Sequence, residues 1–153
     1  MNGQEVFRFA VKKVPECIRQ VTEKTETQIE TIDWFILHQA NSRIIQSVAK
    51  RLGVPEEKFP MNMEQYGNTS AASIPILLDE MNKKGMLQPG QKVILSGFGA
   101  GLTWGAAQIE CRRKAKEKNT GATETWIRRV PLLFFLLRGY QVKVCSCFRI
   151  LKK

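Results

Sequence analysis

Three short segments hold the residues best suited to chemistry, and each lies at a junction between predicted elements. They read HQAN from residue 38, GNTS from residue 67 and GFGAG from residue 97, and His38 is the only histidine among 153 residues. A neutral histidine and an asparagine can each donate a hydrogen bond to a carbonyl oxygen, and glycine lets backbone N–H groups approach a ligand closely. These residue types favour an oxyanion hole, which stabilises negative charge as it develops on an oxygen atom.

Each segment also has a simpler structural interpretation. A lone histidine at the end of a strand is more often structural than catalytic, GNTS can simply cap a helix, and GFGAG alone is typical of a turn. Chemistry is favoured because all three occur in one chain. In a layered fold, the junctions where they lie are the places at which polar groups converge on a ligand while the core stays dry.

The cysteine and histidine content argues against a metal site. Metal ligands recur at short, characteristic spacings, which are absent among Cys17, Cys111, Cys145 and Cys147. The N-terminus does not combine a basic segment with an apolar run and a small-residue cleavage site, so we predict a reducing, cytoplasmic location. The longest apolar run, residues 130–137, is far shorter than the roughly 20 residues of a membrane-spanning helix.

The excess positive charge is confined to one end of the chain. The formal net charge is +10, yet residues 1–111 hold 12 basic and 12 acidic residues, and residues 112–153 hold 12 basic and 2 acidic ones. This abrupt shift predicts two units. Residues 1–111 form the folded domain, and residues 112–153 are a basic tail, either disordered or produced by a frameshift or an artificial junction.

The first half of the folded unit predicts helix, strand and helix in turn. Residues 5–21 carry apolar side chains at helical spacing, and Pro15 makes them one kinked helix or two short ones. The apolar run 32–38 is short and aromatic, which favours a buried strand. Apolar residues then recur at helical spacing over 44–52, and Gly53 is typical of a helix end.

The second half continues with a weaker strand, a helix and a pair of strands. Residues 58–63 are a weak strand candidate because they include a proline. Residues 66–85 read as a loop entering a helix that Gly85 ends, with Pro75 near its first turns and a cap supplied by Asn68, Thr69 or Ser70. Residues 89–111 read as a strand, a glycine-rich turn and a strand. The order α-β-α-(β)-α-β-β predicts an α/β domain with a mixed sheet and helices on both faces.

In this order and with these intervals, HQANSRII, GNTSAAS and GFGAGLTWG resemble the C-terminal half of β-ketoacyl-acyl carrier protein synthase III. That family is built from two similar thiolase-like halves, and the resemblance covers residues 1–111. It implies an acyltransferase that starts fatty acid synthesis. A cysteine takes an acyl group from acyl-CoA, and malonyl-acyl carrier protein loses carbon dioxide and attacks the resulting thioester, with no cofactor.

The resemblance also implies a role for each segment. His38 and Asn68 would donate hydrogen bonds to the malonyl thioester oxygen, and the backbone at Gly99, Ala100 and Gly101 would form a second oxyanion hole. Substrate contacts would come from Asn41 and Phe98.

A basic helix face supplies the expected partner surface. Arg43, Lys50 and Arg51 lie opposite the apolar stripe of the helix over 44–52, and a basic face of this kind is most often simply solvated. By the resemblance it binds the acidic acyl carrier protein, and the complete enzyme is a homodimer. We expect no nucleic-acid partner for such an enzyme.

The family's nucleophilic cysteine belongs to its other half, and none of the cysteines here matches that motif. We therefore expect this polypeptide to be inactive alone, to expose apolar surface and to depend on the missing cysteine-bearing half. Two alternatives stay open: a non-catalytic product of a broken gene, and a binding module that uses the basic tail. Acyl-chain preference, stability alone and the origin of the tail cannot be read from the sequence.

Overall fold

The computed structural model describes residues 3–111 and the backbone of residues 145–150. The main elements of the first range follow in the order α1-β1-α2-α3-α4-β2-β3. The helices are α1 (Gly3–Lys24), α2 (Ser42–Leu52), α3 (Met63–Tyr66) and α4 (Ser73–Lys83). The strands are β1 (Trp34–Leu37), β2 (Lys92–Gly99), β3 (Thr103–Glu110) and β4 (Cys145–Ile150). The predicted tail otherwise lies outside the described residues.

The strands form one mixed sheet in the order β1-β2-β3-β4. β1 runs parallel to β2, with Leu37 opposite Ser96, while β2 and β3 form an antiparallel hairpin in which Phe98 lies opposite Trp104. β4 pairs antiparallel with β3. The predicted mixed sheet is confirmed, and its geometry puts the carboxyl ends of β1 and β2 at the same edge as the start of β3.

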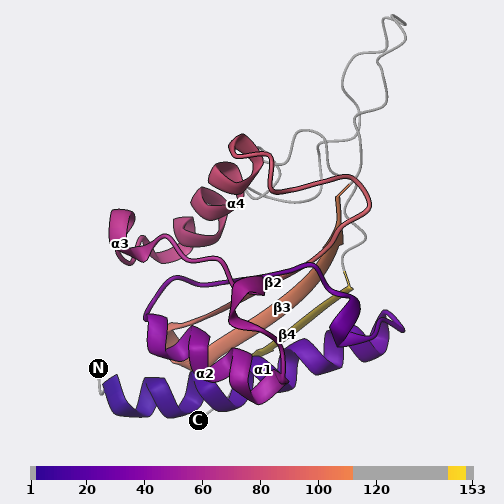
Figure 1. The fold of residues 1–153 in the computed structure, drawn as a ribbon. Helices are drawn as coiled ribbons and strands as arrows, with labels where there is room; N and C mark the ends of the chain where they lie inside the picture. The colour runs from indigo at the N-terminus through magenta and orange to yellow at the C-terminus, as the bar shows by residue number, and fades with distance from the viewer. Residues whose placement is uncertain (1–2, 112–144, 151–153) are drawn as a thin grey trace, which may run out of the picture.

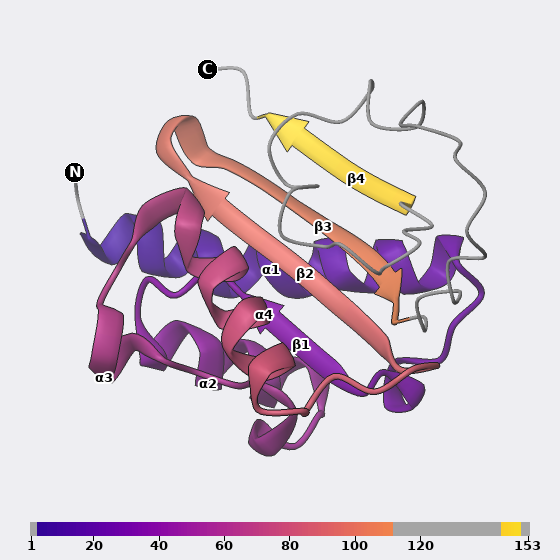
Figure 2. The same cartoon turned by 90° about the horizontal axis from the view of Figure 1, so that it is seen from above.

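Helices cover both faces of this sheet, as predicted. In Figure 1, α1 and α2 lie below the strands and α4 lies above them, and Figure 2 shows α4 crossing over β1 and β2. The layers follow from sequence patterning, because each helix has one apolar stripe that must be buried against the sheet.

The larger core lies between the sheet and the pair α1 and α2. The rings of Phe35 and Phe59 stack there with centroids 4.8 Å apart, and Phe35 is fully buried. Burying a side chain of this size contributes roughly 1.5–3 kcal/mol. A smaller core, which includes Leu77, Met81 and Val93, fills the space between α4 and the other face.

The helix that contains Pro15 is continuous from Gly3 to Lys24, which settles the choice left open by the sequence. Its buried positions follow the predicted apolar stripe, and Pro15 itself is buried among them. Although proline removes one backbone donor from a helix, packing of this face against α2 and β3 outweighs that loss.

The weak strand predicted over residues 58–63 is wrong. The central residues of this segment are irregular, and its last residue, Met63, is the first residue of α3. The backbone N–H of Asn62 donates to the side chain of Gln39 at 3.2 Å instead of to a neighbouring strand, and Pro60 has no N–H to offer.

The predicted side-chain cap of α4 is also wrong. This helix begins at Ser73, and the preceding residue, Ala72, provides no side-chain cap. The polar residues before it form a separate 3-10 turn (Ser70–Ala72), so the chain is already helical where a cap was expected. At the other end, Gly85 adopts a left-handed conformation (φ 67°) just beyond the helix, as predicted.

In the described part of the chain, the helices are too short or too polar to cross a membrane.

Candidate functional site

His38 lies immediately beyond the carboxyl end of β1. Its backbone N–H donates to the carbonyl of Ser96 at 2.8 Å, which continues the parallel pairing of β1 with β2 by one residue. The buried strand before it therefore fixes the position of the His38 backbone, from which the imidazole extends. The strand is buried because its side chains meet helices on both faces of the sheet.

The imidazole of His38 is held by one polar and one aromatic neighbour. Its Nδ1 atom lies 2.7 Å from the hydroxyl oxygen of Ser73, at the start of α4. The ring of Phe98, on β2, meets the imidazole edge to face with centroids 5.4 Å apart. Half-burial lowers the pKa of His38 from its ordinary value of 6.5, because the charged imidazolium is harder to desolvate. The ring is therefore neutral near pH 7.

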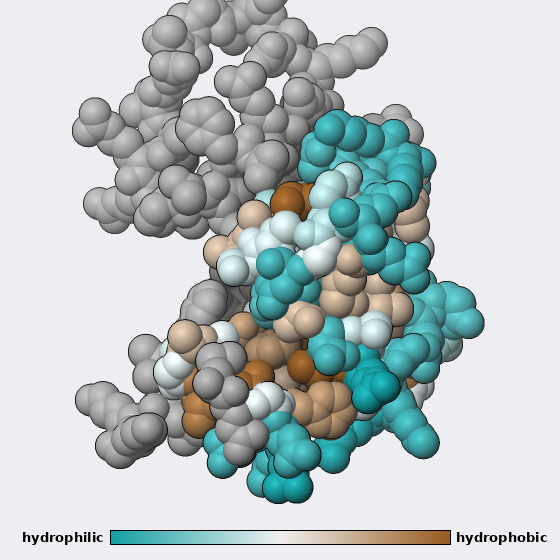
Figure 3. Space-filling view, turned by 90° about the vertical axis from the view of Figure 1, so that its left-hand side faces the viewer, coloured by the Kyte–Doolittle hydropathy of each residue, from teal (hydrophilic) through white to brown (hydrophobic). Residues whose placement is uncertain are grey.

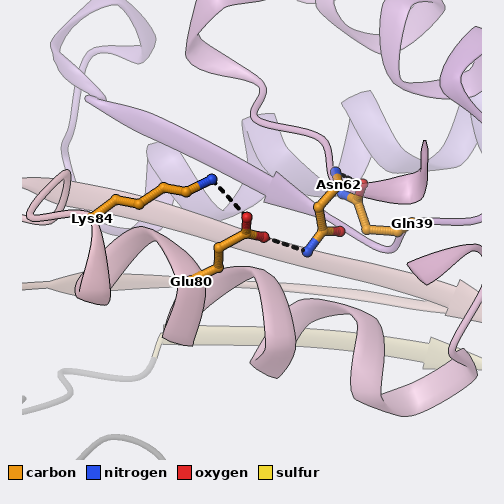
Figure 4. Close-up of polar contacts among 4 residues, drawn as sticks. All are labelled: Gln39, Asn62, Glu80 and Lys84. Carbon is orange, nitrogen blue, oxygen red and sulfur yellow. Dashed lines mark hydrogen bonds and ion pairs between the residues drawn. The ribbon is translucent and has the colours of Figure 1, made fainter. Parts of the chain in front are cut away.

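A hydrogen-bonded chain supports the segment after His38 (Figure 4). The fully buried side chain of Gln39 donates to the carbonyl of Leu37 at 2.8 Å and accepts from the backbone N–H of Asn62 at 3.2 Å. The Asn62 amide donates in turn to Glu80 at 3.0 Å, and Lys84 donates to the other carboxylate oxygen at 2.6 Å. Hydrogen bonds from Lys84 and Asn62 hold the pKa of Glu80 below its ordinary value.

Sequence reasoning missed these supporting residues. Gln39, Asn62, Ser73 and Glu80 come from four segments, and no spacing rule connects them. One signal was present: Gln39 comes two residues after a wholly apolar strand, and a polar side chain at a buried position needs partners.

Asn68 lies in the exposed loop before α4. Its side-chain oxygen accepts a hydrogen bond from the backbone N–H of Ser70 at 2.9 Å. Because a backbone N–H can only donate, this bond identifies the side-chain oxygen and leaves the amide nitrogen facing elsewhere. Among the described residues, that nitrogen makes no hydrogen bond, and no hydrogen bond joins Asn68 to His38. Gly67 and Ser70 have positive φ angles of 62° and 52°, which shape the loop around it.

The glycine-rich turn joins β2 to β3 at the same edge of the sheet. Gly99 is extended and ends β2, whereas Gly101 and Leu102 have φ angles of 73° and 51°. The Thr103 hydroxyl closes the turn by donating to the carbonyl of Ala100 at 3.1 Å. The turn predicted from GFGAG is confirmed, and the residues from Gly99 to Leu102 are all exposed.

Asn41 has a structural task that the sequence reading did not assign. It is the N-cap of α2, and its side-chain oxygen accepts from the backbone N–H of Arg43 at 2.9 Å. The signal was available, because an asparagine just before a helical pattern is a preferred cap. Asn41 itself is exposed.

Figure 3 looks onto the side of the molecule at which α3 and the β2–β3 turn lie. Apolar surface gathers in the middle of this face, with hydrophilic surface around it. Exposed large apolar side chains belong to Met61, Tyr66 and Leu102. A cavity of about 560 Å³ is lined by residues of α3 and α4, by Met61 and Asn62 before α3 and by Ser42 of α2, and none of the predicted site residues lines it.

The model of the family described as 3-oxoacyl-(acyl-carrier-protein) synthase III, C terminal, matches residues 22–111, which is more than half of the chain. The chain belongs to this family. The resemblance read from the three segments is thereby confirmed, and so is the predicted thiolase-like fold class.

Relatives and solved structures agree with this assignment to the synthase III C-terminal family. The β-ketoacyl-(acyl-carrier-protein) synthase III of Pyropia yezoensis is 59% identical over 110 residues, which cover 72% of this chain and 34% of the relative. The chloroplastic synthase III of Arabidopsis thaliana is 55% identical over 112 residues, or 73% and 28% of the two chains. The solved synthase III from Pseudomonas aeruginosa has a TM-score of 0.71 and 38% identity, with coverage of 74% and 35%. The chain thus spans about a third of the length of the relatives it matches.

The two cysteines whose side chains the structure describes are unsuited to act as nucleophiles in this synthase III domain. Cys17 is buried in the core on α1. Cys111 is buried at the opposite edge of the sheet from His38, and burial, with smaller contributions from Asp33 and Glu110, raises its pKa to about 11. Since the thiolate is the reactive form, Cys111 is held as an inert thiol at neutral pH.

The basic residues of α2 are exposed, as the sequence predicted. Arg43, Lys50 and Arg51 lie on the outer side of the helix, while its apolar stripe is buried. Arg19 of α1 reaches the same area, because its guanidinium donates to the carbonyl of Arg51 at 2.6 Å. This fourth cation comes from a helix distant in sequence, so it could not be found from the pattern of α2 alone.

Groups of three or more potential metal-ligating side chains are absent from the part of the chain that the structure describes.

Proposed function

We propose that this domain provides the oxyanion-stabilising half of a β-ketoacyl-acyl carrier protein synthase III, an acyltransferase that starts fatty acid synthesis. The observation that carries the proposal is the half-buried imidazole of His38 at the end of β1, held by Ser73 and Phe98, in a chain of this family. The names of its relatives support the reaction class.

In the proposed reaction, a cysteine thiolate of the other half displaces coenzyme A from acyl-CoA and forms an acyl thioester. Malonyl-acyl carrier protein then loses carbon dioxide, and the electron pair of the broken carbon–carbon bond passes into an enolate. The enolate carbon attacks the acyl thioester, the cysteine thiolate leaves, and 3-ketoacyl-acyl carrier protein is formed. Every bond change in this route is between the two substrates and the cysteine, and no electrons are exchanged with an oxidant or reductant, so we propose that it proceeds without a cofactor.

His38 and Asn68 would donate hydrogen bonds to the enolate oxygen. Donors that meet more negative charge in the transition state than in the ground state lower the barrier. A neutral imidazole suits this role because it donates without giving up its proton. The Asn68 amide is suited as well, since it does not titrate and its oxygen is already held by Ser70.

The remaining predicted residues take supporting roles in this proposal. Backbone N–H groups of Gly99, Ala100 and Gly101 would stabilise the oxygen of the acyl thioester when it is attacked. Phe98, which already packs on His38, would contact the substrate, as would the amide of Asn41.

The partner surface would be the basic side of α2. Arg43, Lys50 and Arg51 are exposed there, and we propose that they attract the acidic acyl carrier protein, chiefly by raising the association rate. The complete enzyme would be a homodimer in the cytoplasm. A second candidate is an enzyme that primes polyketide synthesis, because a priming β-ketosynthase of a polyketide pathway has a TM-score of 0.69 and 36% identity to this chain.

The test is to combine the chain with a cysteine-bearing N-terminal portion of a family member and measure 3-ketoacyl-acyl carrier protein. We expect activity in the mixture and a loss of about 10²–10³-fold for His38→Ala. Lys12→Ala, an exposed change on α1, is the matched control. Persistent inactivity of a soluble mixture would support the non-catalytic alternative. Salt-sensitive lipid or nucleic-acid binding that disappears when residues 112–153 are deleted would support the binding-module alternative.

A further inference from the structure

The hydroxyl of Ser73 lies between two groups of the segment that follows β1. It accepts a hydrogen bond from the backbone N–H of Gln39 at 3.2 Å, and its oxygen is 2.7 Å from Nδ1 of His38. Ser73 is 2% exposed. Among the residues that the structure describes, the Ser73 hydroxyl has no other hydrogen-bond partner.

Counting protons decides the direction of the second bond. A hydroxyl has one proton to donate and two lone pairs that accept, and the Gln39 N–H can only donate, so it occupies a lone pair. The hydroxyl proton needs an acceptor, and Nδ1 is the acceptor within reach. The opposite arrangement, with a proton on Nδ1, would leave the buried hydroxyl proton without a partner, which native structures avoid.

We infer that Ser73 is a positioning residue that fixes the neutral imidazole of His38 as the tautomer with its proton on Nε2. The Nε2–H then points away from Ser73 and is the donor available to a substrate oxygen. This assignment rests on the proposed function, in which His38 acts as a donor, and it names the residue that prepares that donor.

The Gln39 network holds this arrangement in place. Gln39 is bonded on its side chain to Leu37 and Asn62, and Asn62 is bonded to Glu80 on α4, the helix that begins with Ser73 (Figure 4). The segment after β1 and the helix α4 are therefore connected at two points, which fixes the separation between Ser73 and the imidazole. Burial lowers the pKa of His38 and so favours the neutral ring that this arrangement requires.

The single histidine makes the tautomer directly measurable. We would label the full chain with ¹⁵N-histidine and record the two ring nitrogens at pH 8, where the ring is neutral. The expected spectrum has an unprotonated Nδ1 and a protonated Nε2, each at its limiting shift. Ser73→Ala should move both signals toward each other as the tautomers mix, and Ser73→Thr, which keeps the hydroxyl, should restore them.

Ser96→Ala is the matched control. Ser96 is also 2% exposed, and its hydroxyl donates to the carbonyl of Gly105 instead of to the imidazole. Its loss should leave the His38 spectrum unchanged. In the assembled two-half enzyme, Ser73→Ala should lower kcat about tenfold or more with little change in KM, because it acts on the transition state through His38.

Two results would overturn the inference. One is a wild-type ring protonated on Nδ1 or mixed between tautomers, and the other is a folded Ser73→Ala variant with the wild-type spectrum. If Ser73→Ala loses its far-UV circular dichroism, the wild-type spectrum alone decides. The spectrum tests the role of Ser73 and needs no partner half. The proposed function is tested separately, by the activity of the wild-type mixture, so the two failures can be distinguished.

Discussion

The two ends of the sheet use their polar groups differently. At the end away from His38, the carboxylate of Asp33 accepts from the backbone N–H of Lys92 at 2.7 Å, and the Asp33 N–H donates to the Lys92 carbonyl at 2.9 Å. Cys111 likewise exchanges backbone bonds with Gly90 and Gln91. The side chain and backbone groups at this end pair with one another.

At the other end, three candidate side chains are each held by one atom, while another atom has no hydrogen bond to the residues that the structure describes. His38 is held at Nδ1, while Asn68 and Asn41 are held through their side-chain oxygens. The remaining atom is a nitrogen in each case, and it can donate in the two amides and, in the tautomer inferred above, in His38. Positive φ angles do not distinguish the two ends, because Ser70 and Leu102 have them here and Glu26 and Gly90 have them at the other end. The difference lies in the side-chain donors, and donors without a partner inside the protein are typical of functional sites.

The comparison implies that changes at the His38 end alter activity, whereas changes at the Asp33 end alter stability. The sharpest test is Asn68→Asp. This change keeps an oxygen that can accept from the Ser70 N–H but replaces the donating amide with a negative charge. In the assembled enzyme, we expect a loss of about 10²–10³-fold or more in kcat, with unchanged urea stability of the chain.

Asn68→Ala is the companion variant, since it removes the donor without adding charge. If Asn68→Asp retained more activity than Asn68→Ala, donation to a developing oxyanion would be ruled out as the role of this side chain.

The next effect concerns Cys111 at the opposite end. Raising its pKa from 9.0 to about 11 lowers the thiolate fraction at pH 8 by about a hundredfold. Iodoacetamide should therefore alkylate Cys111 at least about a hundredfold more slowly in the folded chain than in urea, as followed by peptide mass spectrometry. Equal rates in the two states would show that this end of the sheet opens to solvent.

Asp33→Ala should destabilise the fold by about 1.5–3 kcal/mol, because it removes a hydrogen bond to a charged carboxylate. Urea unfolding of the chain measures this change. Asp33→Asn keeps an oxygen that can accept, so its loss should be smaller. The per-molecule activity of the folded, assembled Asp33→Ala enzyme should stay at the wild-type level; a drop comparable to that of Asn68→Asp would contradict the division between the two ends.

The smallest effect is the pH dependence that His38 contributes to stability. Its pKa is lower in the folded state than the ordinary 6.5, so the unfolded chain binds the proton more readily. The contribution is fully present above about pH 6.5 and is lost as pH falls through the folded-state pKa. His38→Gln should flatten the slope of unfolding free energy between pH 7 and 5. An identical slope in both proteins would show that burial does not disfavour the charged ring.

The sequence by itself determined the order of the main elements, the mixed sheet and the family. Apolar periodicity identified α1, β1 and α2, and the glycine-rich turn identified the β2–β3 hairpin, because these features depend on residues close together in the chain. It also selected His38 and Asn68, through segments specific enough to indicate the family.

Only the tertiary structure decided what surrounds those residues. Packing kept α1 continuous through Pro15, and near Pro60 the backbone N–H of Asn62 donates to the side chain of Gln39 where a strand was expected. The partner of His38 is Ser73, 35 residues away on another element, and their contact exists only because α4 packs over β1. Local patterns cannot specify such a pair, because the distance between two side chains on different elements depends on how the whole core packs.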